Sequence, residues 1–146
     1  MTPSVPLVHV RIAGRRLRVG IFDSRAVRIV AKRIFEPGDD VTIGGDARSA
    51  IVLPGWSDGP LLLIAEGHLL HLAPGMRLHM CHDGGVDRVV GEYEELLASG
   101  LVLPIPITVA MLNIRVRDGL SLFARYLAED EPLWPTSSDW SKPVPA

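Results

Sequence analysis

The sequence predicts an all-β fold, a β-sandwich or barrel of about nine or more short strands with one short helix. Apolar and polar residues alternate along several segments, and the 14 Gly and 12 Pro residues separate these segments at short intervals. The hydrophobic residues make up 47% of the chain and are mostly aliphatic, since aromatic residues account for only 5%. A length of 146 residues corresponds to one domain with a sizeable core.

The first three expected strands are residues 8–12, 17–21 and 27–35. In the first two, apolar residues occupy every second position, as in strands with one face toward solvent. Tight turns are expected between these strands, at residues 13–15 and 23–25. A Glu-Pro-Gly-Asp-Asp turn ends the third strand, because proline fixes φ and glycine accepts a positive φ.

Five short strands are expected next, and Gly- and Pro-containing turns separate most of them. Gly44 and Gly45 lead from the first of these strands into a polar loop, and Pro54 and Gly55 close the second. The third and fourth are apolar runs on either side of Glu-Gly-His, which predicts a buried hairpin. The five strands are residues 41–43, 50–53, 61–65, 69–73 and 76–81.

The one helix is expected at residues 89–98, where apolar residues follow helical spacing. Gly100 stands where a glycine commonly ends a helix. Residues 101–106 contain two prolines and are expected to form a connection without a strand. Residues 107–116 and 120–127 are expected to form a final hairpin, because an Asp-Gly pair stands between two alternating runs.

The chain divides by composition into a domain, residues 1–129, and a C-terminal segment, residues 130–146. The C-terminal segment is rich in Pro, Ser and acidic residues and has no periodicity, so we expect a disordered tail or a docking segment. It carries Trp134 and Trp140, two of the three tryptophans, which are candidate anchors for a protein partner.

The formal net charge of −2 combines a basic beginning with an acidic end. Residues 1–35 hold seven arginines and one lysine against one aspartate, whereas acidic residues outnumber basic ones from residue 83 onward. This distribution is compatible with three arrangements. The basic residues could form a surface that faces an anion, they could pair with the acidic residues between sheets or protomers, or they could lie on the solvated face of a sheet. The basic region lacks interleaved exposed aromatics, so nucleic-acid binding is not expected.

Composition also restricts the location of the protein. The single cysteine excludes an internal disulfide framework. No apolar run reaches the roughly 18 residues of a membrane-spanning helix, and the first residues do not resemble a secretory signal. We therefore expect a cytoplasmic protein without membrane insertion. The mean hydropathy of +0.24 suggests apolar surface and a homo-oligomer.

Four histidines lie within fifteen residues, beside Cys81 and Asp83. Residues three apart on a strand point to opposite faces, so these histidines supply at most two converging ligands, fewer than a zinc site needs. The neighbours Cys81 and His82 also face opposite ways, which argues against a nucleophile and its base. The expected protein is not an enzyme and has no cofactor, with a metal-binding protein as an alternative. The histidines are His68, His71, His79 and His82.

The segment VTIGGDARSAIVLP, residues 41–54, resembles the start of a forkhead-associated (FHA) domain, where a strand ends in Ile-Gly-Arg and a polar loop leads to a short strand. The chain is similar, more narrowly, to divergent FHA-like domains of myxobacterial motility-type and TonB-related proteins. The stretches GMRLHMCHDGGVDRVVGEYEELLASG and IRVRDGLSLFARYL stand in comparable places, and the resemblance covers residues 16–128. It implies an FHA-like β-sandwich.

This sequence departs from the family members that bind phosphothreonine. Those members use an arginine directly after the glycine of the strand and a Ser-x-x-His in a following loop. Here Gly45 stands in place of the arginine, and Ser57 is followed three residues later by Pro60. A phosphate needs charge-assisted donors, which arginine supplies best, so we expect that the phosphothreonine site is lost.

The predicted function is a non-catalytic protein–protein interaction or assembly module whose partners are proteins, including further copies of itself. An alternative is a phosphopeptide-binding domain with a site rebuilt around Arg48 and Ser49. Trp56 is expected either as an exposed anchor or as a lid over the core. The candidate binding residues are Gly44, Gly45, Arg48, Ser49, Trp56, Ser57, Trp134 and Trp140.

Overall fold

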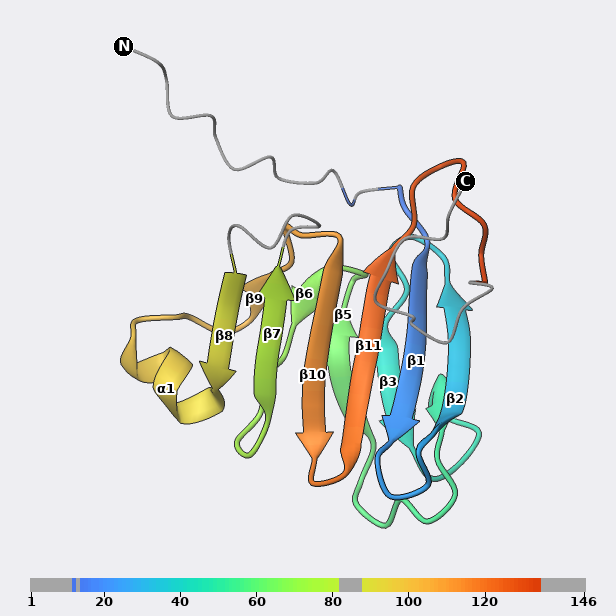
Figure 1. The fold of residues 1–146 in the computed structure, drawn as a ribbon, viewed down its shortest axis with the longest axis horizontal. Helices are drawn as coiled ribbons and strands as arrows, with labels where there is room; N and C mark the ends of the chain where they lie inside the picture. Colours follow the sequence, from blue (N-terminus) through green and yellow to red (C-terminus); the bar gives the residue numbers. More distant parts are fainter. Residues whose placement is uncertain (1–11, 13, 82–87, 135–146) are drawn as a thin grey trace.

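The computed structural model describes residues 12, 14–81 and 88–134, which form two β-sheets and one short helix (Figure 1). The prediction of an all-β sandwich with one short helix is confirmed for these residues. The larger sheet has the strand order β2–β1–β11–β10–β7–β8. Its strands are β1 (Leu17–Asp23), β2 (Arg28–Phe35), β7 (Arg77–Cys81), β8 (Arg88–Glu92), β10 (Met111–Arg117) and β11 (Leu120–Tyr126).

The smaller sheet has the strand order β4–β3–β5–β6–β9. Its strands are β3 (Val41–Gly44), β4 (Ile51–Val52), β5 (Leu61–Ala65), β6 (Leu69–Leu70) and β9 (Ile105–Pro106). The strand β4 runs parallel to β3, and the other pairs of this sheet are antiparallel. The strand expected at residues 8–12 lies outside the described residues except for Ile12, which packs against the core.

The inner faces of the two sheets form the core. Alternate residues of β1, β10 and β11 point inward, and Val19, Ile21, Ile114 and Leu122 are fully buried. They face apolar residues of the smaller sheet such as Ile43. Burial of these side chains supplies the main driving force for the fold, at about 25 cal/mol per Å² of apolar surface.

The helix prediction was wrong at its start. The helix α1 comprises Tyr93–Ala98, whereas residues 89–92 belong to β8 and pair with β7. Val89 and Val90 are β-branched and favour extended structure, and β7 offers them backbone partners. A Cβ at Gly91 would lie 3.2 Å from the Leu96 side chain, so the strand and the helix approach closely at this residue. Gly100, at φ +99°, follows the C-cap as expected.

The connection expected at residues 101–106 contains β9, so that expectation was wrong for Ile105 and Pro106. Both pair with β6 at the edge of the smaller sheet. Proline has no N–H to donate, and an edge strand is where a sheet tolerates it.

Tyr126, at the end of β11, ties the two sheets together. Its hydroxyl donates a hydrogen bond of 2.6 Å to the carbonyl oxygen of Gly67, in the β5–β6 turn of the other sheet. Burial raises the pKa of Tyr126 well above its ordinary value, so the hydroxyl keeps its proton as a donor.

We predict that Tyr126→Phe lowers the free energy of unfolding by about 1–2 kcal/mol, because the partly buried Gly67 carbonyl loses this hydrogen bond. Urea denaturation measures the change. Tyr93→Phe, at the other tyrosine, is the matched control and is expected to change stability by less than about 0.5 kcal/mol. Equal effects of the two substitutions would contradict the role given to the Tyr126 hydroxyl.

Candidate functional site

Four connections gather at one end of the sandwich, at the bottom of Figure 1, and are called the loop end below. They are the β1–β2 turn (24–27), the β3–β4 loop (45–50), the β4–β5 loop (53–60) and the β10–β11 turn (118–119). The Ser24 N–H donates to the Gly119 carbonyl oxygen at 2.9 Å, which joins the first connection to the last. Most of the sequence-predicted binding residues lie at or beside this end.

The pair Gly44 and Gly45 lies at the end of β3, where backbone and side chains approach closely. The Ser49 side chain lies directly against the Cα of Gly44 and is buried. A Cβ at Gly45 would lie 2.5 Å from the Trp56 carbonyl oxygen. The β4–β5 loop therefore fills the space that a side chain at residue 45 would need.

Arg48 is exposed and contacts a carboxylate of its own loop. Its Nη2 lies 2.8 Å from Asp46 Oδ2, and its Nε and backbone N–H also donate to Asp46. These hydrogen bonds lower the pKa of Asp46 and raise that of Arg48. The two residues of the predicted rebuilt site thus differ, since Arg48 is exposed and paired while the Ser49 side chain points into the fold.

Trp56 forms a lid over the core, which is one of the two alternatives expected from the sequence. Leu53–Pro54–Gly55–Trp56 is a tight turn with Gly55 at φ +89° and a Trp56 N–H to Leu53 oxygen bond of 3.0 Å. The ring is half-buried and packs against the core. Its Nε1 donates to the Gly59 carbonyl oxygen at 3.1 Å, so the polar edge of the ring is satisfied within the loop.

Arg117 and Asp58 belong to this site and were missed by the sequence interpretation. The Arg117 Cζ lies 3.7 Å from the centroid of the Trp56 ring, and its Nη2 donates to Asp58 Oδ2 at 2.6 Å. The guanidinium therefore stacks on the tryptophan while it binds the carboxylate. Local sequence could not predict a contact between residues 59 positions apart.

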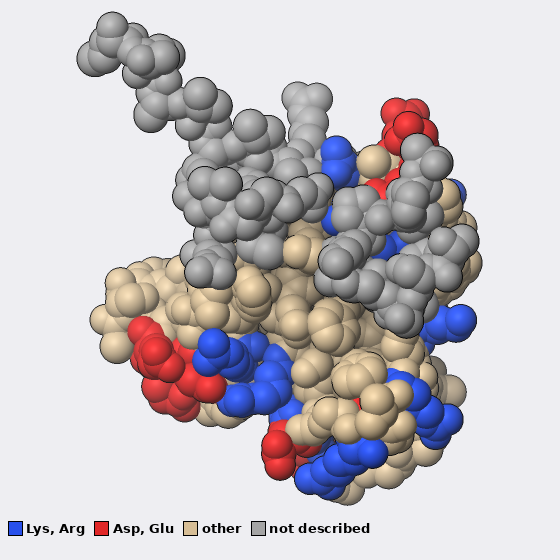
Figure 2. Space-filling view, viewed as in Figure 1, with Lys and Arg blue, Asp and Glu red and all other residues tan. Residues whose placement is uncertain are grey.

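The β1–β2 turn presents an apolar side chain to solvent. Val27 is 75% exposed and adopts φ +52°, a conformation that β-branched residues rarely adopt. Arg25 and Arg28 flank it in the sequence, and Arg25 pairs with Asp118 at 3.6 Å. Figure 2 shows basic and acidic side chains intermixed at this end of the molecule.

The remaining predicted residues are not part of one cluster. Ser57 is exposed in the β4–β5 loop. Trp134 lies on the larger sheet beside Lys32, whose Nζ is 5.3 Å from the ring centroid. Trp140 lies outside the described residues.

The histidines do not converge in the described part of the chain. His68 and His71 flank β6 in the smaller sheet, whereas His79 lies on β7 in the larger sheet. His82 lies outside the described residues. Among the residues that the structure describes, no group of three or more His, Cys, Asp or Glu side chains is placed to hold a metal ion.

Comparisons with protein-family models, curated proteins and solved structures give no match to this chain. Within the described residues, the chain has no helix with the length and apolar character needed to cross a bilayer.

We predict that Gly45→Ala lowers the free energy of unfolding by about 1–3 kcal/mol and shifts the tryptophan emission, because the new Cβ pushes the Trp56 backbone away. Urea denaturation and fluorescence measure both effects. The control is Gly59→Ala, in the same loop as Trp56, where a Cβ would meet nothing within 4 Å. If both variants behave alike, the close approach of Gly45 to Trp56 is not a constraint.

Proposed function

We propose that this chain is a non-catalytic protein-interaction module on an FHA-like β-sandwich, which contacts a protein partner through the loop end without reading a phosphothreonine. The module needs no cofactor. The proposed place of action is the cytoplasm, with which a chain that has one cysteine and no internal disulfide is compatible.

The lack of space for a side chain at Gly45, beside the Trp56 carbonyl oxygen, carries this proposal. The resemblance to FHA domains places the phosphate-binding arginine at this position, and a Cβ here would meet that oxygen at 2.5 Å. A substitution to arginine would therefore have to displace the β4–β5 loop before it could serve a phosphate. The loop is held in place by the Trp56 turn and by the stacked Arg117.

The ion pairs of the loop end also favour a partner that is not an anion. Three arginines at this end have carboxylate partners at 2.6–3.6 Å, and the distances are short for Arg48 and Arg117. A phosphate would have to compete with these carboxylates for the guanidinium groups. The loop end thus combines a rim of paired charged residues with the exposed apolar side chain of Val27. The backbone of Val27 is strained, as is common at functional sites.

Photo-crosslinking tests the proposed surface. Benzoylphenylalanine in place of Val27 is expected to form a covalent adduct with a protein partner in the native host cells. Prior treatment with a phosphatase is expected to leave the adduct unchanged, because recognition does not depend on a phosphate.

The control position is Val102, which has the same residue type and is 77% exposed but lies between α1 and β9, away from the loop end. At least tenfold less adduct is expected there. Equal labelling from both positions, or none from Val27, would refute the loop end as the contact surface. Adduct that disappears after phosphatase treatment would favour the alternative phosphopeptide site.

Phosphothreonine peptides are expected to bind the full chain no more tightly than their unphosphorylated forms. Calorimetric titration with a degenerate phosphothreonine peptide library checks this expectation. Binding that requires the phosphate and falls at least tenfold in Arg48→Gln, but not in Arg28→Gln, would overturn the proposal and support a site rebuilt at Arg48.

A further inference from the structure

Two arginines lie side by side on the outer face of the larger sheet and are almost wholly buried. Arg18 on β1 and Arg125 on β11 are direct register partners, so their side chains share one face. Their chain neighbours Leu17 and Ala124 point into the core, which places the arginines on the opposite face. Arg18 is nevertheless only 1% exposed and Arg125 5%.

A segment after β11 lies over this pair, and its attachment is polar. The Arg125 Nε donates to Glu131 Oε2 at 3.0 Å, and the Glu131 side chain is 7% exposed. The Ala128 N–H donates to the other oxygen of Glu131 at 3.3 Å. Arg18 Nη1 reaches the Leu133 carbonyl oxygen at 3.5 Å. The first part of the expected C-terminal segment therefore lies on the chain's own sheet.

The positive charges of Arg18 and Arg125 favour a carboxylate as their partner. Burial lowers the pKa of Arg18, the negative charge of Glu131 acts in the opposite direction, and Arg125 lowers it further. Two neighbouring guanidinium groups out of water are costly without a negative partner, and apolar residues would fill the same space at lower cost. The forked donors of arginine fit a carboxylate well.

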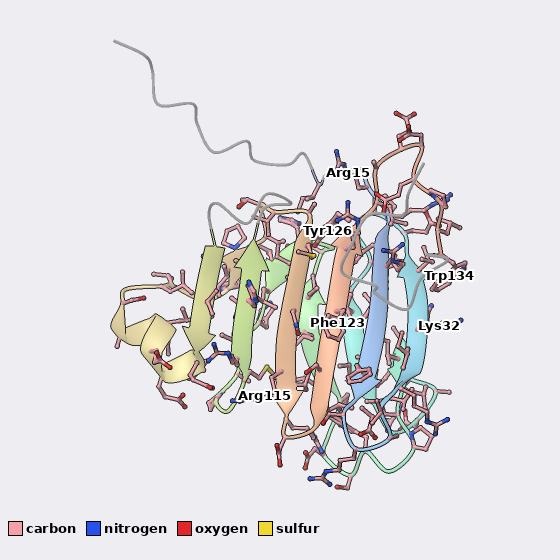
Figure 3. The ribbon with its side chains drawn as sticks, viewed as in Figure 1. Arg15, Lys32, Arg115, Phe123, Tyr126 and Trp134 are labelled. Carbon is pink, nitrogen blue, oxygen red and sulfur yellow. The ribbon has the colours of Figure 1, made fainter. Side chains whose placement is uncertain are left out.

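Leu127 is buried at the start of this segment, but the described residues that follow it add little buried apolar surface. Glu129, Asp130 and Pro132 are exposed, and Leu133 and Trp134 keep 38% and 41% of their surface exposed. Trp134 lies beside Lys32 of β2, with its ring 5.3 Å from Nζ (Figure 3). Because the described residues after Leu127 bury little apolar surface, this segment opens locally at lower cost than the core strands.

We propose that the Arg18–Arg125 pair is a binding site for an acidic linear segment of a partner protein, and that Glu131 is its occupant within this chain. The favoured ligand carries a glutamate in the place of Glu131 and an aromatic residue three positions later, in the place of Trp134. Glu131 competes with the partner for the site and regulates its binding. The site lies on the face of the larger sheet, not at the loop end, and does not rest on the function proposed above.

Fluorescence anisotropy with a labelled peptide of residues 128–134 tests the proposal on the full chain. Glu131→Gln removes the competing carboxylate, so this variant is expected to bind the peptide at least tenfold more tightly than the unaltered chain. Glu129→Gln makes the same charge change at an exposed neighbour and is expected to behave like the unaltered chain. A peptide with glutamine in place of Glu131 is expected to lose at least tenfold in affinity.

Equal peptide binding by all three chains, or no binding by Glu131→Gln, would overturn the proposal. A Glu131→Gln chain that dimerises in size-exclusion chromatography without binding the peptide would also overturn it and assign this face to contact between copies.

Hydrogen exchange on the unaltered chain tests the proposal even if Glu131→Gln does not fold. The amides of Ala128 and Glu131 are expected to exchange at least tenfold faster than those of Val19 and Leu122, through local opening. Exchange at the same rate as in these core strands would mean that the segment opens only with global unfolding, which would overturn a site that a partner can enter.

Discussion

The pairing of β1 with β11 is the constraint on which the rest of the structure depends. Seven residues of each strand pair without a shift, from Leu17 opposite Tyr126 to Asp23 opposite Leu120. Because side chains alternate between faces, this register sends the apolar residues inward and places Arg18 beside Arg125 on the other face. A slip by one residue would turn these arginines into the core. The same register brings the β1–β2 turn to Gly119 at the loop end.

Charges that are separated in the sequence compensate each other within one molecule. Arg25, in the basic first part of the chain, pairs with Asp118, and Arg18 interacts electrostatically with Glu131. The exposed pairs contribute little to stability, about 0–1 kcal/mol each. The pair of Arg125 and Glu131 differs because both side chains are buried and each would be costly alone. The near-neutral net charge of the chain thus includes a buried ion pair, Arg125 with Glu131, that holds a segment on the outer face of the sheet.

The local sequence pattern predicted the elements whose apolar alternation or turn residues are enough to specify a strand or a turn. The expected strand at residues 61–65 matches β5, and the Asp-Gly turn between β10 and β11 lies where the hairpin was expected. The pattern failed at residues 89–92, because their apolar spacing also suits a helix. These residues form a strand because they pair with β7, and the local sequence does not show that pairing. Of the candidate site, Gly45 and Trp56 could be found from the sequence, but Arg117 and Asp58 could not, since each looks like an ordinary surface charge until the fold joins them.

The sequence by itself determined an all-β sandwich, most of its strands and turns, and the glycine pair at residues 44 and 45. These features depend on side-chain alternation and on backbone preferences, which act over a few residues. Only the tertiary structure decided that the Trp56 carbonyl fills the space beside Gly45, that Arg117 stacks on Trp56, and that Glu131 meets the arginines on β1 and β11. Such contacts depend on which strands become neighbours, and strand pairing between distant segments is a property of the whole packed chain.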